Sequence, residues 1–157
     1  MLGVFLHSIH RITYHDFSDK EDGECMIEFK DIIKSYSDHL ALDRLSFQIK
    51  EGHHLALIGP SGCGKSTALR ILAGLDFATC GKILIDGTIA SDASKNLVPP
   101  HQRQISMVFQ DLGLWPNLSV RENVELGLYA LLKSQRREWA NEALKICKIS
   151  ELENRKP

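Results

Sequence analysis

The sequence lacks a strong net charge, a long apolar run and a targeting segment. It carries 19 basic and 20 acidic side chains among 157 residues, so its formal net charge is −1. A nearly neutral chain has no global field that attracts nucleic acid or an anionic membrane, and we expect no nucleic-acid partner. No apolar run reaches the ~18 residues of a spanning helix, and the apolar start at residues 1–6 lacks the basic residues and cleavage site of a secretory signal. Any connection to a membrane is therefore expected to run through a partner protein.

The sequence also lacks a metal-ligand spacing of cysteines, an internal repeat and a low-complexity tract. Its four cysteines are widely separated: Cys25, Cys63, Cys80 and Cys147. Four cysteines allow three disulfide pairings, and the spacing does not choose among them. The length suits one domain, and the composition of 43% hydrophobic and 25% charged residues is that of an ordinary soluble globular protein.

What the sequence does contain is a glycine-rich stretch that fits the phosphate-binding template of Gly, four residues and Gly-Lys-Ser/Thr. Its members are Gly59, Pro60, Ser61, Gly62, Cys63, Gly64, Lys65, Ser66 and Thr67. The apolar residues 55–58 before it suit a buried strand, and residues 68–74 after it have helical character and end on a glycine. The alternative is a Gly/Ser turn that happens to precede a helix. We disfavour it because the loop is complete and both flanks fit.

The residue types of this loop explain its chemistry. Glycines let the backbone adopt positive φ and approach phosphates closely, and the N–H groups and dipole at the helix N-terminus attract the anion. Lys65 would reach the β and γ phosphates, and the Ser66 hydroxyl would ligate Mg²⁺. The chain is therefore predicted to bind a nucleoside triphosphate, or to descend from a protein that did. Such a protein is expected in the reducing cytoplasm with free thiols, and Cys63 near the helix N-terminus is the candidate reactive one.

The first 25 residues differ from the rest. They show no clear periodicity, and residues 16–24 form an acidic run typical of a solvated or disordered segment. We therefore expect residues 26–157 to be the domain, with either Met26 as the true start or residues 1–25 as a dispensable extension. An extra strand near residues 9–14 is the open alternative.

From residue 27 onward the pattern predicts an α/β fold. Strands are expected at residues 27–33, 42–49, 55–58, 82–86 and 105–109, the last ending at Gln110. Residues 91–101 are polar and contain prolines, so they are predicted to form a loop. Ser119 followed by Glu122 is a capping box that opens a helix reaching residue 132. A further helix is expected at about residues 135–148.

Several separated stretches together resemble the ATP-binding subunit of ABC transporters. They are Tyr36, residues 42–47, the loop at 59–67, residues 72–75, residues 81–87, residues 99–103, residues 107–110 and residues 114–124. The resemblance covers residues 27 to about 157, and this ordered set separates ABC proteins from kinases and GTPases. It implies a P-loop core joined by an antiparallel β subdomain and a helical subdomain, of which the N-terminal part is present.

The resemblance also implies roles for single residues. Tyr36 resembles the aromatic residue that stacks on adenine, residues 59–67 resemble the Walker A loop, and Gln110 resembles the Q-loop glutamine that helps to bind Mg²⁺ and the attacking water. By themselves, Tyr36 is more typical of a partly buried packing residue and Gln110 of a glutamine at a strand end. Residues 99–103 and 114–116 are most similar to importers of sugars, polyamines or iron.

The family further implies ATP and Mg²⁺ as ligands, a transmembrane permease subunit and a second ATP-binding subunit as partners, and a cytoplasmic location on the membrane face. No catalytic residue is identified. The nearest apolar runs with an acid end at Asp86 and Asp111, and neither has the second acid of a Walker B segment. No Leu-Ser-Gly-Gly-Gln signature or switch histidine is found, so we expect a truncated ATPase domain that binds ATP without hydrolysing it and folds poorly alone. A non-catalytic nucleotide-binding or permease-docking module and a non-functional gene fragment are the alternatives.

Overall fold

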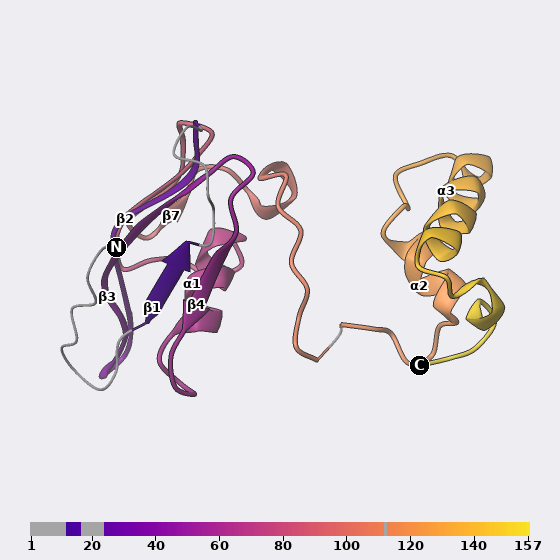
Figure 1. Ribbon diagram of the computed structural model, residues 1–157, viewed down its shortest axis with the longest axis horizontal. Coiled ribbons are helices and arrows are strands. Elements are labelled where there is room, and N and C mark those ends of the chain that lie inside the picture. The colour runs from indigo at the N-terminus through magenta and orange to yellow at the C-terminus, as the bar shows by residue number, and fades with distance from the viewer. Residues whose placement is uncertain (1–11, 17–23, 112) are drawn as a thin grey trace. The chain divides into compact units, whose positions relative to one another are not determined.

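The computed structural model describes residues 12–16, 24–111 and 113–157, in two compact units (Figure 1). The first unit is Met1–Met107 and the second is Val108–Pro157. Among the residues described, no helix has the length and apolar character needed to cross a membrane.

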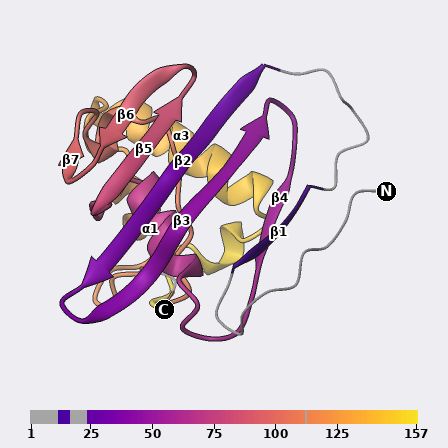
Figure 2. The same cartoon turned by 90° about the vertical axis from the view of Figure 1, so that its left-hand side faces the viewer.

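The first unit contains a five-stranded antiparallel sheet (Figure 2). Its order is β3-β2-β5-β6-β7, with β2 at Cys25–Tyr36, β3 at His39–Lys50, β5 at Cys80–Ile85, β6 at Thr88–Asp92 and β7 at Lys95–Asn96. The predicted strands at 27–33, 42–49 and 82–86 are confirmed, because alternating apolar residues give each strand one buried face. Phe29 of β2 lies opposite Phe47 of β3, and their rings stack with centroids 4.3 Å apart.

Helix α1 (Lys65–Leu72) packs on the core of this sheet. Ala68 and Ile71 of the helix are buried in one cluster with Phe29, Ile32 and Ile83 of the strands. The strand β4 (Leu55–Ile58) precedes the helix, as the apolar run at 55–58 predicts. The order of strand, glycine loop and helix is therefore confirmed.

Strand β4 pairs antiparallel with β1 (Thr13–Asp16), and Thr13 lies opposite Ile58. This pairing overlaps the alternative strand near residues 9–14. We expected the acidic run at residues 16–24 to be solvated or disordered. Most of that run, residues 17–23, lies outside the described residues. Residues 1–11 lie outside them as well.

The second unit is helical. It contains α2 (Val120–Leu126), α3 (Lys133–Ile146) and the short 3₁₀ turn η2 (Ser150–Leu152). The capping box is confirmed: the Ser119 hydroxyl accepts from the Glu122 N–H at 3.2 Å, and a Glu122 carboxylate oxygen accepts from the Ser119 N–H at 2.7 Å. The Arg121 side chain pairs with Glu153, and its N–H donates to the Glu153 carbonyl, so the segment after α3 is tied back to α2.

Three expectations about element bounds are wrong. Residues 105–109 form no strand, because no other described strand pairs with them; Val108 there is 89% exposed. Residues 91–101 are not a plain loop, since they contain the end of β6, the strand β7 and the start of the 3₁₀ turn η1 (Pro100–Gln102). Helix α2 ends at Leu126 rather than at residue 132, because Gly127, a poor helix former, follows it.

Candidate phosphate-binding site

The loop between β4 and α1 needs glycine for two different reasons. Gly62 and Gly64 both have positive φ, 80° and 98°. A Cβ on Gly62 would meet nothing within 4 Å, so only the backbone conformation requires glycine there. A Cβ on Gly64 would lie 2.3 Å from the Ala41 carbonyl oxygen and 2.7 Å from Leu42 Cδ2. The turn into α1 therefore rests directly on the backbone of β3.

Lys65, the first residue of α1, folds back onto the loop. Its Nζ donates to the carbonyl oxygens of Gly59 at 2.8 Å and Pro60 at 2.7 Å, and it lies 3.4 Å from Cys63 Sγ. A positive charge is thus held inside the curve of the loop. The N-terminal N–H groups of α1 lie next to it and carry the positive end of the helix dipole.

The other loop side chains differ in exposure. Ser61 and Ser66 are exposed, whereas Cys63 is buried and is a free thiol, as are Cys25, Cys80 and Cys147. Cys63 is also on the wall of a cavity of ≈ 440 Å³ that is otherwise lined by Ile12 and β3 residues 41–46. Among the described residues that line this cavity, Cys63 is the one that belongs to the loop.

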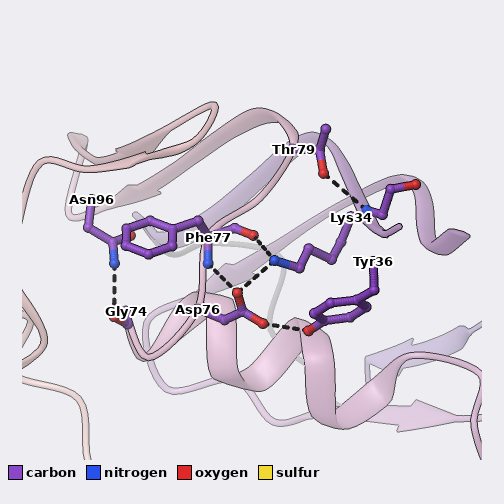
Figure 3. A network of polar contacts seen from close by, with 8 residues as sticks. Lys34, Tyr36, Gly74, Asp76, Phe77, Thr79 and Asn96 are labelled. Atoms are coloured by element: carbon purple, nitrogen blue, oxygen red, sulfur yellow. Dashed lines mark hydrogen bonds and ion pairs between the residues drawn. The ribbon is translucent and has the colours of Figure 1, made fainter. Parts of the chain in front are cut away.

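Tyr36 ends β2 and belongs to a polar network drawn in Figure 3. Its hydroxyl donates to Asp76 Oδ2, and the Thr67 hydroxyl of α1 is a second partner. Lys34 Nζ lies 4.5 Å from the centroid of the Tyr36 ring. Burial raises the pKa of Tyr36 above its ordinary value, and the bond to Asp76 acts in the same direction. Tyr36 nevertheless stays 44% exposed, so its ring is both anchored and accessible.

Gln110 lies in the second unit, in a turn, and it is exposed. The expectation that it follows a strand is wrong, but its proposed role does not depend on that strand. No group of three or more His, Cys, Asp or Glu side chains suited to a metal occurs in the part of the chain that the structure describes. Ser66 and Gln110 each carry a hard oxygen of the type that Mg²⁺ prefers.

Lys34 and Asp76 both contact Tyr36, and neither was predicted from the sequence. Asp76 is separated from Lys34 by 42 positions, and nothing local to either residue indicates that they pair. The only sequence signal is the short distance from Lys34 to Tyr36 along one strand, which places both side chains on the same face.

The loop has the features of a phosphate-binding site. A Cβ at Gly62 would meet open space, Lys65 supplies an ammonium held by loop carbonyls, and the first turn of α1 supplies N–H groups that have no partner within the helix. This arrangement can bind and orient phosphates.

Comparisons with known proteins show which family the chain resembles. Residues 42–157 match the family model described as ABC transporter. The chain is 38% identical over 135 residues to the "Spermidine/putrescine import ATP-binding protein PotA" of Oleidesulfovibrio alaskensis, covering 84% of this chain and 35% of the relative. It is 40% identical over 131 residues to the "Fe(3+) ions import ATP-binding protein FbpC" of Photorhabdus laumondii, covering 82% of this chain and 36% of the relative.

Solved structures show the same relationship. The dimeric structure of MJ0796, a bacterial ABC transporter cassette, has a TM-score of 0.69 at 34% identity, covering 84% of this chain and 62% of that one. Its post-hydrolysis state bound to ADP and Pi has a TM-score of 0.63 at 29% identity, with the same coverage of 84% and 62%. The chain spans 35% of the length of the first curated relative. With more than half of its residues matched to the family model, this chain belongs to the ABC transporter family and has the fold of its ATP-binding cassettes.

Proposed function

We propose that this chain binds ATP with Mg²⁺ as part of an ATP-binding subunit that serves solute import. The observation that carries the proposal is the complete glycine loop between β4 and α1, with the Lys65 ammonium held inside it by the Gly59 and Pro60 carbonyls. The names of the relatives, which are import ATP-binding proteins, support the same function.

The residues of the loop have different roles in ATP binding. The backbone N–H groups at Gly62, Gly64 and the first turn of α1 hold the phosphate oxygens, and Lys65 compensates the charge of the β and γ phosphates. The Ser66 hydroxyl and the Gln110 side-chain oxygen are the proposed Mg²⁺ ligands. Pro60, Ser61 and Cys63 shape the loop, and Thr67 links it to Tyr36.

Partners follow from the same family membership. We propose a transmembrane permease subunit and a second ATP-binding subunit, and a location on the cytoplasmic face of the membrane. Exposed apolar side chains in the second unit support a protein partner there: Val108 is 89% exposed, Tyr129 74% and Trp115 57%. Sugars, polyamines and iron are the candidate solutes.

The test is equilibrium binding of a labelled ATP analogue to the 157-residue chain and to Lys65→Ala. We expect Lys65→Ala to abolish detectable binding, because backbone dipoles alone do not balance the phosphate charge. Lys82→Ala is the matched control, since Lys82 is an exposed lysine of β5 that pairs with the surface carboxylate of Asp92. If Lys65→Ala binds within about twofold of the parent chain (under ~0.5 kcal/mol), the loop is not the site.

A further inference from the structure

We infer that Lys34 and Asp76 are positioning residues that fix the Tyr36 ring, so that one of its faces receives the base of the bound nucleotide. The inference rests on the proposed function, since it assigns how the base is held when the loop holds the phosphates. It is carried by the contacts between the end of β2 and the segment after α1 (Figure 3).

The Asp76 carboxylate is held by three donors. Its Oδ1 accepts from Lys34 Nζ at 2.6 Å and from the Phe77 N–H at 2.7 Å, and its Oδ2 accepts from the Tyr36 hydroxyl. Both carboxylate oxygens are thus engaged, and the side chain is only 16% exposed. A carboxylate bound on both oxygens has one orientation, so the Tyr36 hydroxyl is bound at a fixed point.

Lys34 constrains the same ring from a second direction. Its side chain is 11% exposed, and its ammonium donates to Asp76 and, at 2.7 Å, to the Phe77 carbonyl. The ammonium lies 4.5 Å from the Tyr36 ring centroid, within the range of a cation–π contact. One face of the ring is therefore covered by Lys34, and its opposite face is the one on which a planar base can stack.

The backbone beneath these side chains is also tied. The Ser35 N–H donates to Thr79 Oγ1 at 3.0 Å, and the Thr79 N–H donates to the Ile33 carbonyl at 2.7 Å. These two bonds lock the end of β2 to the segment after α1. Thr67 of α1 also contacts the Tyr36 hydroxyl. The ring is therefore held in a fixed position relative to the helix that begins at the phosphate loop.

The fixed position of the Tyr36 ring relative to the phosphate loop affects nucleotide affinity. A nucleotide spans from base to γ-phosphate, so a stacking surface contributes affinity only if it stands at the right distance from the phosphate site. The network fixes that distance before binding. Stacking on Tyr36 contacts the face of a base and not its hydrogen-bonding edge, so any planar base can stack there. A ligand that has phosphates but no base gains no affinity from this contact.

The experiment compares ATP with inorganic tripolyphosphate, which lacks the base, on the 157-residue chain. The variants are Asp76→Ala, Lys34→Met, Tyr36→Ala and the double variant Tyr36→Ala/Asp76→Ala. We expect Asp76→Ala and Lys34→Met each to weaken ATP binding about fivefold or more while changing tripolyphosphate binding less than about twofold, by loss of oriented stacking. Adding Asp76→Ala to Tyr36→Ala should change ATP binding by less than about twofold, because the ring it positions is gone.

Two further variants serve as controls for the loss of an Asp–Lys pair and for misfolding. Asp92→Ala removes an Asp–Lys pair on the exposed side of the sheet, where Asp92 Oδ2 lies 3.4 Å from Lys82, and it should change neither ligand. Asp76→Asn keeps the shape and one acceptor oxygen, and it should fold even if Asp76→Ala does not. We expect Asp76→Asn to show a smaller loss that is again confined to ATP.

The outcomes separate this inference from the proposed function. Equal losses for ATP and tripolyphosphate in Asp76→Ala, or an undiminished effect of Asp76→Ala in the Tyr36→Ala background, would overturn the inference and make the network a purely structural tie. Binding of both ligands with equal affinity by the parent chain, lost in Lys65→Ala, would also overturn it while leaving the phosphate site intact. Failure of the folded parent chain to bind either ligand would overturn both proposals.

Discussion

Arg103 Nη1 donates a hydrogen bond of 2.7 Å to the carbonyl oxygen of Leu72, the last residue of α1. The rest of the guanidinium is bound in the same way, to five further neutral oxygens: the carbonyls of Ile71, Ala90 and Val98, Ser91 Oγ and Asn96 Oδ1. Arg103 is 3% exposed, and burial lowers the pKa of its guanidinium, which still remains charged. The cation closes the C-terminal end of the helix whose N-terminus forms the phosphate loop, where a positive charge complements the helix dipole.

The first prediction concerns this buried cation. Arg103→Ala should lower the free energy of unfolding by about 3 kcal/mol, because it removes six hydrogen bonds made by one buried cation. Arg103→Lys should recover only part of the loss, since an ammonium cannot reproduce the fork of a guanidinium. Urea unfolding followed by circular dichroism measures both. Arg44→Ala, at an exposed position, is the control and should cost less than ~0.5 kcal/mol; an equal loss in the two alanine variants would refute the role of Arg103.

The second prediction concerns the ring of Tyr36. Tyr36→Ala should weaken ATP binding roughly ten- to a hundredfold, the magnitude of base–aromatic stacking. Tyr36→Phe and Tyr36→Trp should each lose less than Tyr36→Ala, because an aromatic face remains, and the loss in Tyr36→Phe should be no larger than that in Asp76→Ala, since both changes remove the bond between the Tyr36 hydroxyl and Asp76. Titration with a fluorescent ATP analogue tests all three variants. Unchanged binding by Tyr36→Ala would return this residue to a packing role.

The third prediction is a pH dependence of stability at Asp76. Burial acts to raise the pKa of Asp76, but the hydrogen bonds from Lys34, Tyr36 and the Phe77 N–H together hold it below its ordinary value. A carboxyl whose pKa is lower in the folded chain stabilises the fold above its unfolded pKa of about 3.9, and this stabilisation is lost as the pH falls through the folded value. The parent chain should therefore be more stable than Asp76→Asn at pH 7, and the difference should shrink towards pH 3. A difference in unfolding free energy that is the same at both pH values would contradict the assigned pKa shift.

The fourth prediction concerns catalysis. Hydrolysis requires a carboxylate that positions the attacking water, and the two acids that end apolar runs, Asp86 and Asp111, both lie in turns. The chain should release phosphate from ATP no faster than Lys65→Ala. A turnover of about 1 per second or faster in the parent chain, typical of a working phosphoryl-transfer enzyme, would mean that one of these acids acts. Asp86→Asn and Asp111→Asn would then identify it.

The sequence predicts well where the determinants are local. The loop at 59–67, the strand before it and the capping box at Ser119 each follow from a few adjacent residues, and the structure confirms them. The strand expected at 105–109 is wrong because apolar residues form a strand only when another strand pairs with them, and the sequence of a segment does not show its partner. The strand β7 at Lys95–Asn96 was missed for the opposite reason: it is polar and short, and its pairing with β6 defines it.

Residues whose partners lie far along the chain are beyond such reasoning. Asp76 reads as an ordinary loop acid, and Arg103 as part of a polar stretch, until the fold places Lys34 and the end of α1 beside them. Tyr36 was identified through a family resemblance, and the contacts that anchor its ring emerge only from the structure. The roles of Gln110 and of the loop residues in binding stay predictions.

The hydrogen bonds from Lys65 to the Gly59 and Pro60 carbonyls lower the entropic cost of binding an anion. A lysine side chain that becomes immobilised loses roughly 1.5–2 kcal/mol of rotamer entropy. In this chain much of that loss has already occurred on folding, because the ammonium is held in the loop by two acceptors. Arrival of an anion then exchanges one set of oxygens for another around an ordered cation, and the entropic penalty of association is smaller than for a freely rotating lysine.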